Sequence, residues 1–157
     1  MKQLILLLLS ISLISYSCDD DDDHQLIDLP QAIQDYLANN FPNHEIEESA
    51  EETLCDGTAV IEVELETDDE EEIELVFSNE EVLLYAESEI ENVELPSEIT
   101  NSVSQNYPNH TLKEASKLDV ADGSTQYEVE VKQGDTTLDV LMSSDGMVLC
   151  EEEDLDD

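Results

Sequence analysis

The sequence predicts an α+β protein made of two tandem repeats, each with one short helix packed on a roughly four-stranded antiparallel β-meander. Three observations support this prediction: a pair of copies related by a constant offset, an apolar stripe with helical spacing at the start of each copy, and alternating apolar and acidic segments after it. The chain of 157 residues is also strongly acidic, with a formal net charge of -39.

The internal duplication is the first guide to the architecture. Three motifs recur at the same offset of 66 residues: Leu29-Pro30 as Leu95-Pro96, Phe41-Pro42-Asn43-His44 as Tyr107-Pro108-Asn109-His110, and Asp56-Gly57 as Asp122-Gly123. Collinear matches of this kind indicate a duplicated structural unit. After the central strand of each copy the offset becomes 65.

A short helix is predicted at the start of each copy. The proline of each Leu-Pro pair suits the first position of a helix, where no N–H donor is needed. Apolar residues then fall four apart, at Ile33 and Leu37 in the first copy and at Ile99 and Val103 in the second. Pro42 and Pro108 are expected to end the two helices.

Strands are predicted after each helix. Residues 59–66 alternate between apolar and acidic side chains, which is typical of a strand with one buried face. The predicted strands lie near 46–54, 59–65, 73–77 and 82–86 in the first copy, and near 112–120, 127–131, 138–142 and 147–150 in the second. Short turns between them indicate hairpins. Residues 88–94 are expected to link the copies, and the sequence leaves open whether the two copies share one sheet.

The N-terminus is similar to a bacterial lipoprotein signal. A short positive start, Met1-Lys2, precedes an apolar run over 4–14 and then Ser17-Cys18. The resemblance implies that residues 1–17 are removed and that Cys18 carries the lipid, although Ser15 stands where such signals usually have leucine. The alternative is ordinary secretion with Cys18 unmodified.

Residues 18–28 are expected to form an acidic tether. The five aspartates Asp19 to Asp23 repel one another and favour a solvated segment. An acidic stretch after the lipidated cysteine resembles the signal that places Bacteroidota lipoproteins on the outer surface of the outer membrane. The alternative is a spacer that carries no address.

The charge distribution excludes several classes of partner. Residues 29–94 hold 22 acidic and no basic side chains, residues 95–150 hold 9 acidic and 3 basic ones, and residues 151–157 form an acidic tail. Such a chain cannot neutralise phosphates, which excludes nucleic acid and binding to anionic lipid through a basic patch. We expect a monomer kept soluble by self-repulsion, with the lipid on Cys18 as its membrane contact.

The order of motifs resembles the PepSY-like family, also described as beta-lactamase-inhibitor-like. The shared features are the Leu-Pro helix start, the aromatic-Pro-Asn helix end, the Tyr-Glu-Val-Glu type strand and the closing hairpin that contains Ser144-Asp145-Gly146. Two tandem copies would cover residues 29–92 and 93–150. The first copy departs from the pattern at Asn79-Glu80-Glu81, where a glycine turn is usual. The resemblance implies a non-catalytic envelope domain that binds or restrains other proteins.

The residues that carry chemistry point away from catalysis. His24 lies in the tether, and His44 and His110 occupy equivalent positions after the two helices, which favours a structural role. The sequence contains no phosphate-binding glycine loop, HExxH motif or CxxC motif. We therefore predict no catalytic residues and no cofactor apart from weakly bound calcium.

Two cysteines remain in the predicted globular part of the chain. Cys55 and Cys150 do not occupy equivalent repeat positions. They can form a disulfide that joins the first copy to the end of the second, since the cell envelope permits oxidation. Alternatively, they remain two separate, partly buried thiols.

An acidic face is predicted on the outward side of the first copy. Its residues are Glu62, Glu64, Glu66, Asp68, Asp69, Glu70, Glu72 and Glu74. If the two strands pair, these carboxylates become cross-strand neighbours, an arrangement that destabilises a sheet. Three interpretations follow: a solvated surface, a weak calcium site without EF-hand spacing, or a docking face for a basic protein.

Together these features predict a non-catalytic envelope lipoprotein whose repeats bind a protein partner, as an inhibitor or a regulator. The alternative is an acidic calcium-binding or surface-charge protein with no specific partner.

Overall fold

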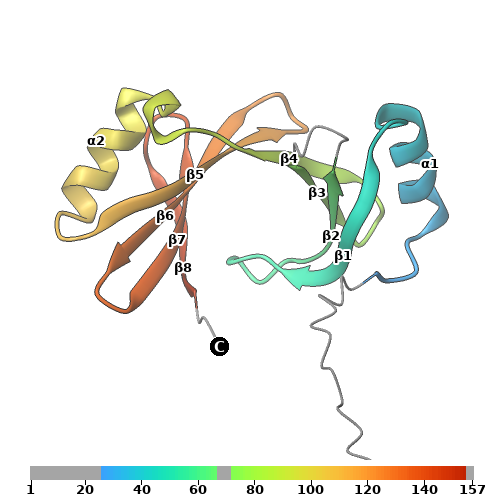
Figure 1. Cartoon of the computed structure of the whole chain (residues 1–157), viewed down its shortest axis with the longest axis horizontal. Helices are drawn as coiled ribbons and strands as arrows, with labels where there is room; N and C mark the ends of the chain where they lie inside the picture. The colour runs from blue at the N-terminus through green and yellow to red at the C-terminus, as the bar shows by residue number, and fades with distance from the viewer. Residues whose placement is uncertain (1–25, 67–71, 155–157) are drawn as a thin grey trace, which may run out of the picture.

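One continuous sheet organises the molecule. The computed structural model describes residues 26–66 and 72–154, and within them eight antiparallel strands lie in chain order (Figure 1). The strands are β1 (Glu45–Thr53), β2 (Ala59–Glu66), β3 (Glu72–Ser78), β4 (Leu83–Glu89), β5 (Thr111–Val120), β6 (Thr125–Gln133), β7 (Thr136–Ser143) and β8 (Val148–Asp154). The two copies share this sheet because β4 pairs with β5, from Tyr85 opposite Val120 to Glu89 opposite Ser116. The predicted α+β class is confirmed.

Each copy contributes one α-helix of ten residues, α1 (Gln31–Asn40) and α2 (Ser97–Asn106). Each helix begins directly after the proline of its Leu-Pro motif. The residues that cap the C-terminal ends are Phe41 and Tyr107, whose backbone N–H groups donate to the carbonyls four residues earlier at 2.8 Å. The following prolines prevent continuation, as the sequence predicts.

The helices lie on the outer, convex face of the curved sheet (Figure 1). Ile33 of α1 and Ile99 of α2 are fully buried, and each belongs to a separate apolar core. The first core includes Val63, Leu75 and Phe77, and the second includes Val129, Val140 and Met142. Because both helices cover the convex face, they leave the concave face of the sheet uncovered.

The last hairpin of each copy is built in the same way despite different turn residues. The hydroxyl oxygens of Ser78 and Ser143 accept hydrogen bonds from the backbone N–H groups of Val82 and Met147, at 3.3 and 3.2 Å. The residue before each of these N–H groups has a positive φ, 62° at Glu81 and 81° at Gly146. A glutamate therefore adopts the backbone conformation that glycine adopts in the second copy.

Two predicted boundaries differ from the structure. The link expected over 88–94 begins inside β4, which ends at Glu89, and contains the short 3-10 helix η1 (Asn92–Glu94). The acidic tail expected from residue 151 begins inside β8, which continues to Asp154. In both places the chain continues to pair with the neighbouring strand, β5 for the end of β4 and β7 for the end of β8. The backbone hydrogen bonds of this pairing make the strands longer than the composition of the sequence predicts.

Candidate functional site: the concave acidic cleft

The predicted acidic face lies on the concave side of the sheet. Alternation along β2 places Ile61, Val63 and Leu65 in the core beneath α1, so its glutamates point to the opposite face. On β3, Glu74 is paired with Glu64 and Glu72 with Glu66, which makes the expected cross-strand neighbours. Asp68, Asp69 and Glu70 lie outside the described residues, as do Cys18 and His24.

A row of four glutamates crosses the first four strands. Glu48, Glu64, Glu74 and Glu87 lie directly opposite one another in turn, from β1 to β4. Adjacent strands are about 4.8 Å apart, and like charges at this spacing repel one another. The row therefore places four carboxyl groups side by side on the concave face.

Beside this row lies a cleft with a volume of about 850 Å³. Its carboxyl groups come from both copies: Glu52, Asp56, Glu62, Glu74, Glu87, Glu128, Asp139, Glu152 and Glu153. Apolar groups lie between them, including Leu84, Leu141 and the ring of Tyr85. The cleft thus combines negative charge with apolar contact area, and it includes residues from both repeats.

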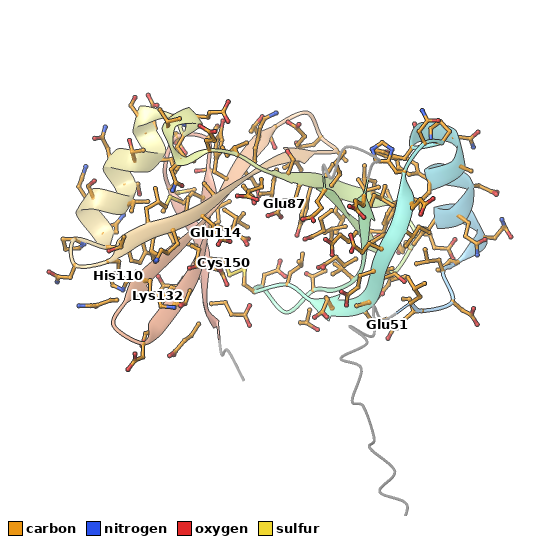
Figure 2. All side chains as sticks on the ribbon, viewed as in Figure 1. Glu51, Glu87, His110, Glu114, Lys132 and Cys150 are labelled. Atoms are coloured by element: carbon orange, nitrogen blue, oxygen red, sulfur yellow. A yellow bond between two sulfur atoms is a disulfide. The ribbon has the colours of Figure 1, made fainter. Side chains whose placement is uncertain are left out.

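A disulfide closes one side of this cleft. Cys55, in the turn between β1 and β2, is bonded to Cys150 on β8, with a Cα–Cα distance of 6.1 Å. Both cysteines line the cleft, and Figure 2 shows Cys150 near the turn that reaches across from the first copy. The bond joins the first hairpin to the last strand, so it links the two ends of the sheet.

Burial raises the pKa values of the carboxyl groups in the cleft. Burial and the charge of Glu52 raise the pKa of Glu62 to about 7, and burial and Glu87 raise the pKa of Glu74 to about 9. The pKa of Glu128 rises to about 8 through burial and Glu87. Burial also raises the pKa of Glu87, opposed by a hydrogen bond with Ser116. Part of the cleft is therefore protonated at neutral pH.

Four important residues of this site were missed by the sequence analysis: Tyr85, Glu87, Glu128 and Glu152. Burial, and then the charge of Glu74, raise the pKa of Tyr85. Figure 2 shows Glu87 on β4 at the middle of the sheet. The alternation of β6 predicts that Glu128 lies on the face opposite the core. Its proximity to Glu62 depends on both copies sharing one sheet, which the sequence leaves open.

A smaller group of carboxylates fits the calcium interpretation of the acidic face. Glu47, Glu64 and Glu72 each place an oxygen within 4.8 Å of the others. Oxygen ligands from clustered carboxylates are what calcium prefers. Glu64 and Glu72 belong to the predicted face, whereas Glu47 lies at an irregularity in the pairing of β1 with β2.

The equivalent histidines support the ends of the two helices. The ring of His44 meets that of Phe41 edge to face at a centroid distance of 5.3 Å, and His110 meets Tyr107 in the same way at 5.6 Å. Their backbone N–H groups donate to the carbonyls of these aromatic residues at 3.2 and 3.0 Å. Neither histidine lines the concave cleft.

One known protein family matches both copies of the chain. The family described as "Putative beta-lactamase-inhibitor-like, PepSY-like" matches the chain twice, over residues 23–85 and 84–149. The chain belongs to this family. The two PepSY-like segments correspond to the two copies detected by internal repetition, and membership in an inhibitor-like family favours a non-enzymatic protein.

Solved structures from Bacteroides share the PepSY-like fold. A BLIP-like protein from Bacteroides fragilis NCTC 9343 has 27% identity and a TM-score of 0.55, over 87% of this chain and 96% of that chain. A DUF2874 family protein from Bacteroides uniformis ATCC 8492 has 13% identity and a TM-score of 0.58, over 80% and 89%. A protein from Bacteroides eggerthii DSM 20697, described as "putative periplasmic", has 11% identity and a TM-score of 0.59, over 81% and 90%.

No protein of curated function matches the PepSY-like chain significantly. In the part of the chain that the structure describes, the helices are also too short to cross a bilayer.

Proposed function

We propose that this protein is a non-catalytic envelope lipoprotein that binds another protein on the concave face of its sheet and inhibits or regulates it. One observation carries the proposal: the helices of both copies cover the convex face and leave a concave cleft of about 850 Å³. A curved sheet face of this kind can enclose a projecting part of a partner. Membership in an inhibitor-like family supports the same role.

The proposed anchor is the lipid on Cys18, followed by the acidic tether. This arrangement would hold the globular part away from an outer-membrane surface and leave the cleft accessible. Mass spectrometry of the N-terminal peptide from membranes tests the anchor. The expected peptide begins at Cys18 with added acyl mass, and a peptide that retains residues 1–17, or an unmodified Cys18, contradicts it.

Affinity capture tests partner binding. The mature chain, immobilised through its tether, is exposed to an envelope extract, and retained proteins are identified by mass spectrometry. The matched control is a Gln126→Trp variant, in which a large side chain fills the cleft without changing its charge. We expect a protein that the native chain retains and the variant does not. Equal retention by both would contradict a partner site on the concave face.

The second candidate is calcium binding, which the proximity of Glu47, Glu64 and Glu72 favours. Specific binding predicts a larger rise of the melting temperature with calcium than with magnesium at matched ionic strength. A Glu72→Gln variant should lose this difference. Equal effects of the two ions would indicate general charge screening instead.

A further inference from the structure

The described lining of the cleft holds nine carboxyl groups and no basic side chain. The pKa values of Glu62, Glu74 and Glu128 are raised by burial and by other acidic groups. Lys117 forms an ion pair with Asp119 at 2.7 Å, and its strand position opposite Tyr127 places it on the helix-covered side of the sheet. A cation from outside the chain would therefore complement the cleft.

The cleft also offers contact area for the apolar part of a long cationic side chain. Leu84, Leu141 and the aromatic ring of Tyr85 lie among the carboxylates. Lysine and arginine place an aliphatic stem along apolar surface while the charged group reaches a polar partner. Arginine can in addition stack on an aromatic ring. A bare metal ion would contact only the carboxylate oxygens and would make no contact with the apolar lining.

The spacing of the glutamate row suits an extended segment. From Glu48 to Glu87 the row crosses four adjacent strands, a distance of about 14 Å at about 4.8 Å per strand. In an extended chain, alternate side chains on one face are about 6.8 Å apart. Two cationic side chains at positions i and i+2 would thus span the end of the row that lies in the cleft, at Glu74 and Glu87.

We infer that the concave cleft binds an extended segment of a partner protein that carries lysine or arginine at alternate positions. This inference rests on the proposed function, because it names the part of the partner that the concave face recognises. The cationic groups contact Glu62, Glu74 and Glu87, and their aliphatic stems lie against Tyr85 and Leu141. Nucleic acid does not fit the site because its backbone has the same sign of charge.

A defined peptide tests this inference. The probe is a capped, fluorescent peptide with two lysines separated by one residue, and its control is the same peptide with both lysines acetylated. Binding to the mature chain is measured by fluorescence anisotropy at two salt concentrations. We expect the lysine peptide to bind at least about tenfold more tightly than the acetylated one, with an affinity that falls as salt increases.

Two matched sets of variants distinguish binding in the cleft from non-specific electrostatic attraction to an acidic protein. The cleft set is Glu62→Gln, Glu74→Gln and Glu87→Gln, and the control set removes three exposed carboxylates elsewhere, by Glu51→Gln, Glu98→Gln and Glu114→Gln. The cleft set should lose at least about tenfold in affinity and the control set less than about threefold. Unchanged or higher melting temperatures would show that the cleft variants fold, since neutralisation removes repulsion.

Equal losses in the two sets, or equal binding of acetylated and free lysine peptides, would overturn the cationic-segment inference. The affinity-capture experiment described above tests the proposed function independently of this inference. A partner that is lost with Gln126→Trp but kept by the cleft set would preserve the concave binding face and reject cationic recognition. A partner kept by both would reject the concave face itself.

Discussion

Glu74 on β3 lies directly opposite Glu87 on β4, near the middle of the concave face. Burial raises the pKa of both groups, and the charge of Glu87 raises the pKa of Glu74 further. A folded chain with these two groups ionised holds two half-buried negative charges side by side, whereas the unfolded chain exposes both to water. Proton binding and folding are therefore linked at this pair.

The first prediction concerns the pH dependence of stability. The pKa values of Glu62, Glu74 and Glu128 are about 7, 9 and 8 in the folded chain, above the ordinary value of 4.5. The folded state thus binds more protons, and its stabilisation is complete below pH 4.5 and lost as the pH rises through 7 to 9. We expect a melting temperature at pH 5.5 that exceeds that at pH 9 by at least about 5 °C.

Thermal unfolding followed by circular dichroism at constant ionic strength measures this difference. In the Glu74→Gln and Glu128→Gln double variant the dependence between pH 7 and pH 9 should become shallower. A melting temperature that rises with pH across this range would contradict the assignment of raised pKa values to these groups.

The second prediction concerns the disulfide. Cys55 and Cys150 are separated by 95 residues, so the bond restricts a long loop in the unfolded chain. Its removal in a Cys55→Ser and Cys150→Ser variant should lower the free energy of unfolding by about 2–4 kcal/mol. Urea unfolding of both proteins measures the change. Equal stability before and after reduction of the native chain would contradict a closed disulfide.

The third prediction compares glycine turns. A Cβ atom on Gly146 would lie 2.6 Å from the backbone oxygen of Glu98 in α2, whereas one on Gly57 would meet no atom within 4 Å. Both glycines have positive φ. Gly146→Ala should therefore destabilise the fold by at least about 2 kcal/mol, and Gly57→Ala by about 1 kcal/mol, from backbone strain alone.

The fourth prediction uses the equivalent turn in the first copy. Glu81 has a φ of 62° and an exposed side chain. Glu81→Gly should raise the free energy of unfolding by roughly 0.5–1 kcal/mol, because glycine adopts this conformation without a steric cost. Chemical denaturation measures the change, and Glu80→Gly is the control, which should not stabilise. A loss of stability in Glu81→Gly would contradict the strain argument.

The fifth prediction concerns the end of α2. The Tyr107 hydroxyl donates to Glu151 on β8 at 2.7 Å, and burial together with this bond raises the pKa of Tyr107 to about 12. Tyr107→Phe should cost about 1 kcal/mol. A double-mutant cycle with Glu151→Ala measures the coupling, and additive effects would show that the hydrogen bond contributes nothing.

The helices and central strands could be predicted because local patterns specify them. The spacing of Ile33 and Leu37 indicates a helix face, and the alternation along β2 indicates which side chains enter the core. Proline positions then place the ends of both helices. These features depend on residues within one or two turns of one another, so they can be read from one copy alone.

The cleft could be predicted only in part because it depends on register. The pairing shifts between Ile46 and Glu48 and between Val76 and Phe77, and each shift changes which residues share a face. Glu87 and Glu128 line the same cleft because β4 pairs with β5. The internal repeat in the sequence does not show whether the two copies pair in this way. Of the predicted acidic face, Glu62 and Glu74 line the cleft, and the remaining carboxyl groups of the cleft lie on other strands or in the turn after β1.

The chain order of the strands has a consequence for assembly. Every strand pairs with its neighbour along the chain, so the sheet can grow by successive closure of adjacent hairpins. The Cys55–Cys150 bond instead joins positions that meet after the intervening strands have taken their places. The bond therefore fixes covalently how the first hairpin lies against the last strand of the completed sheet.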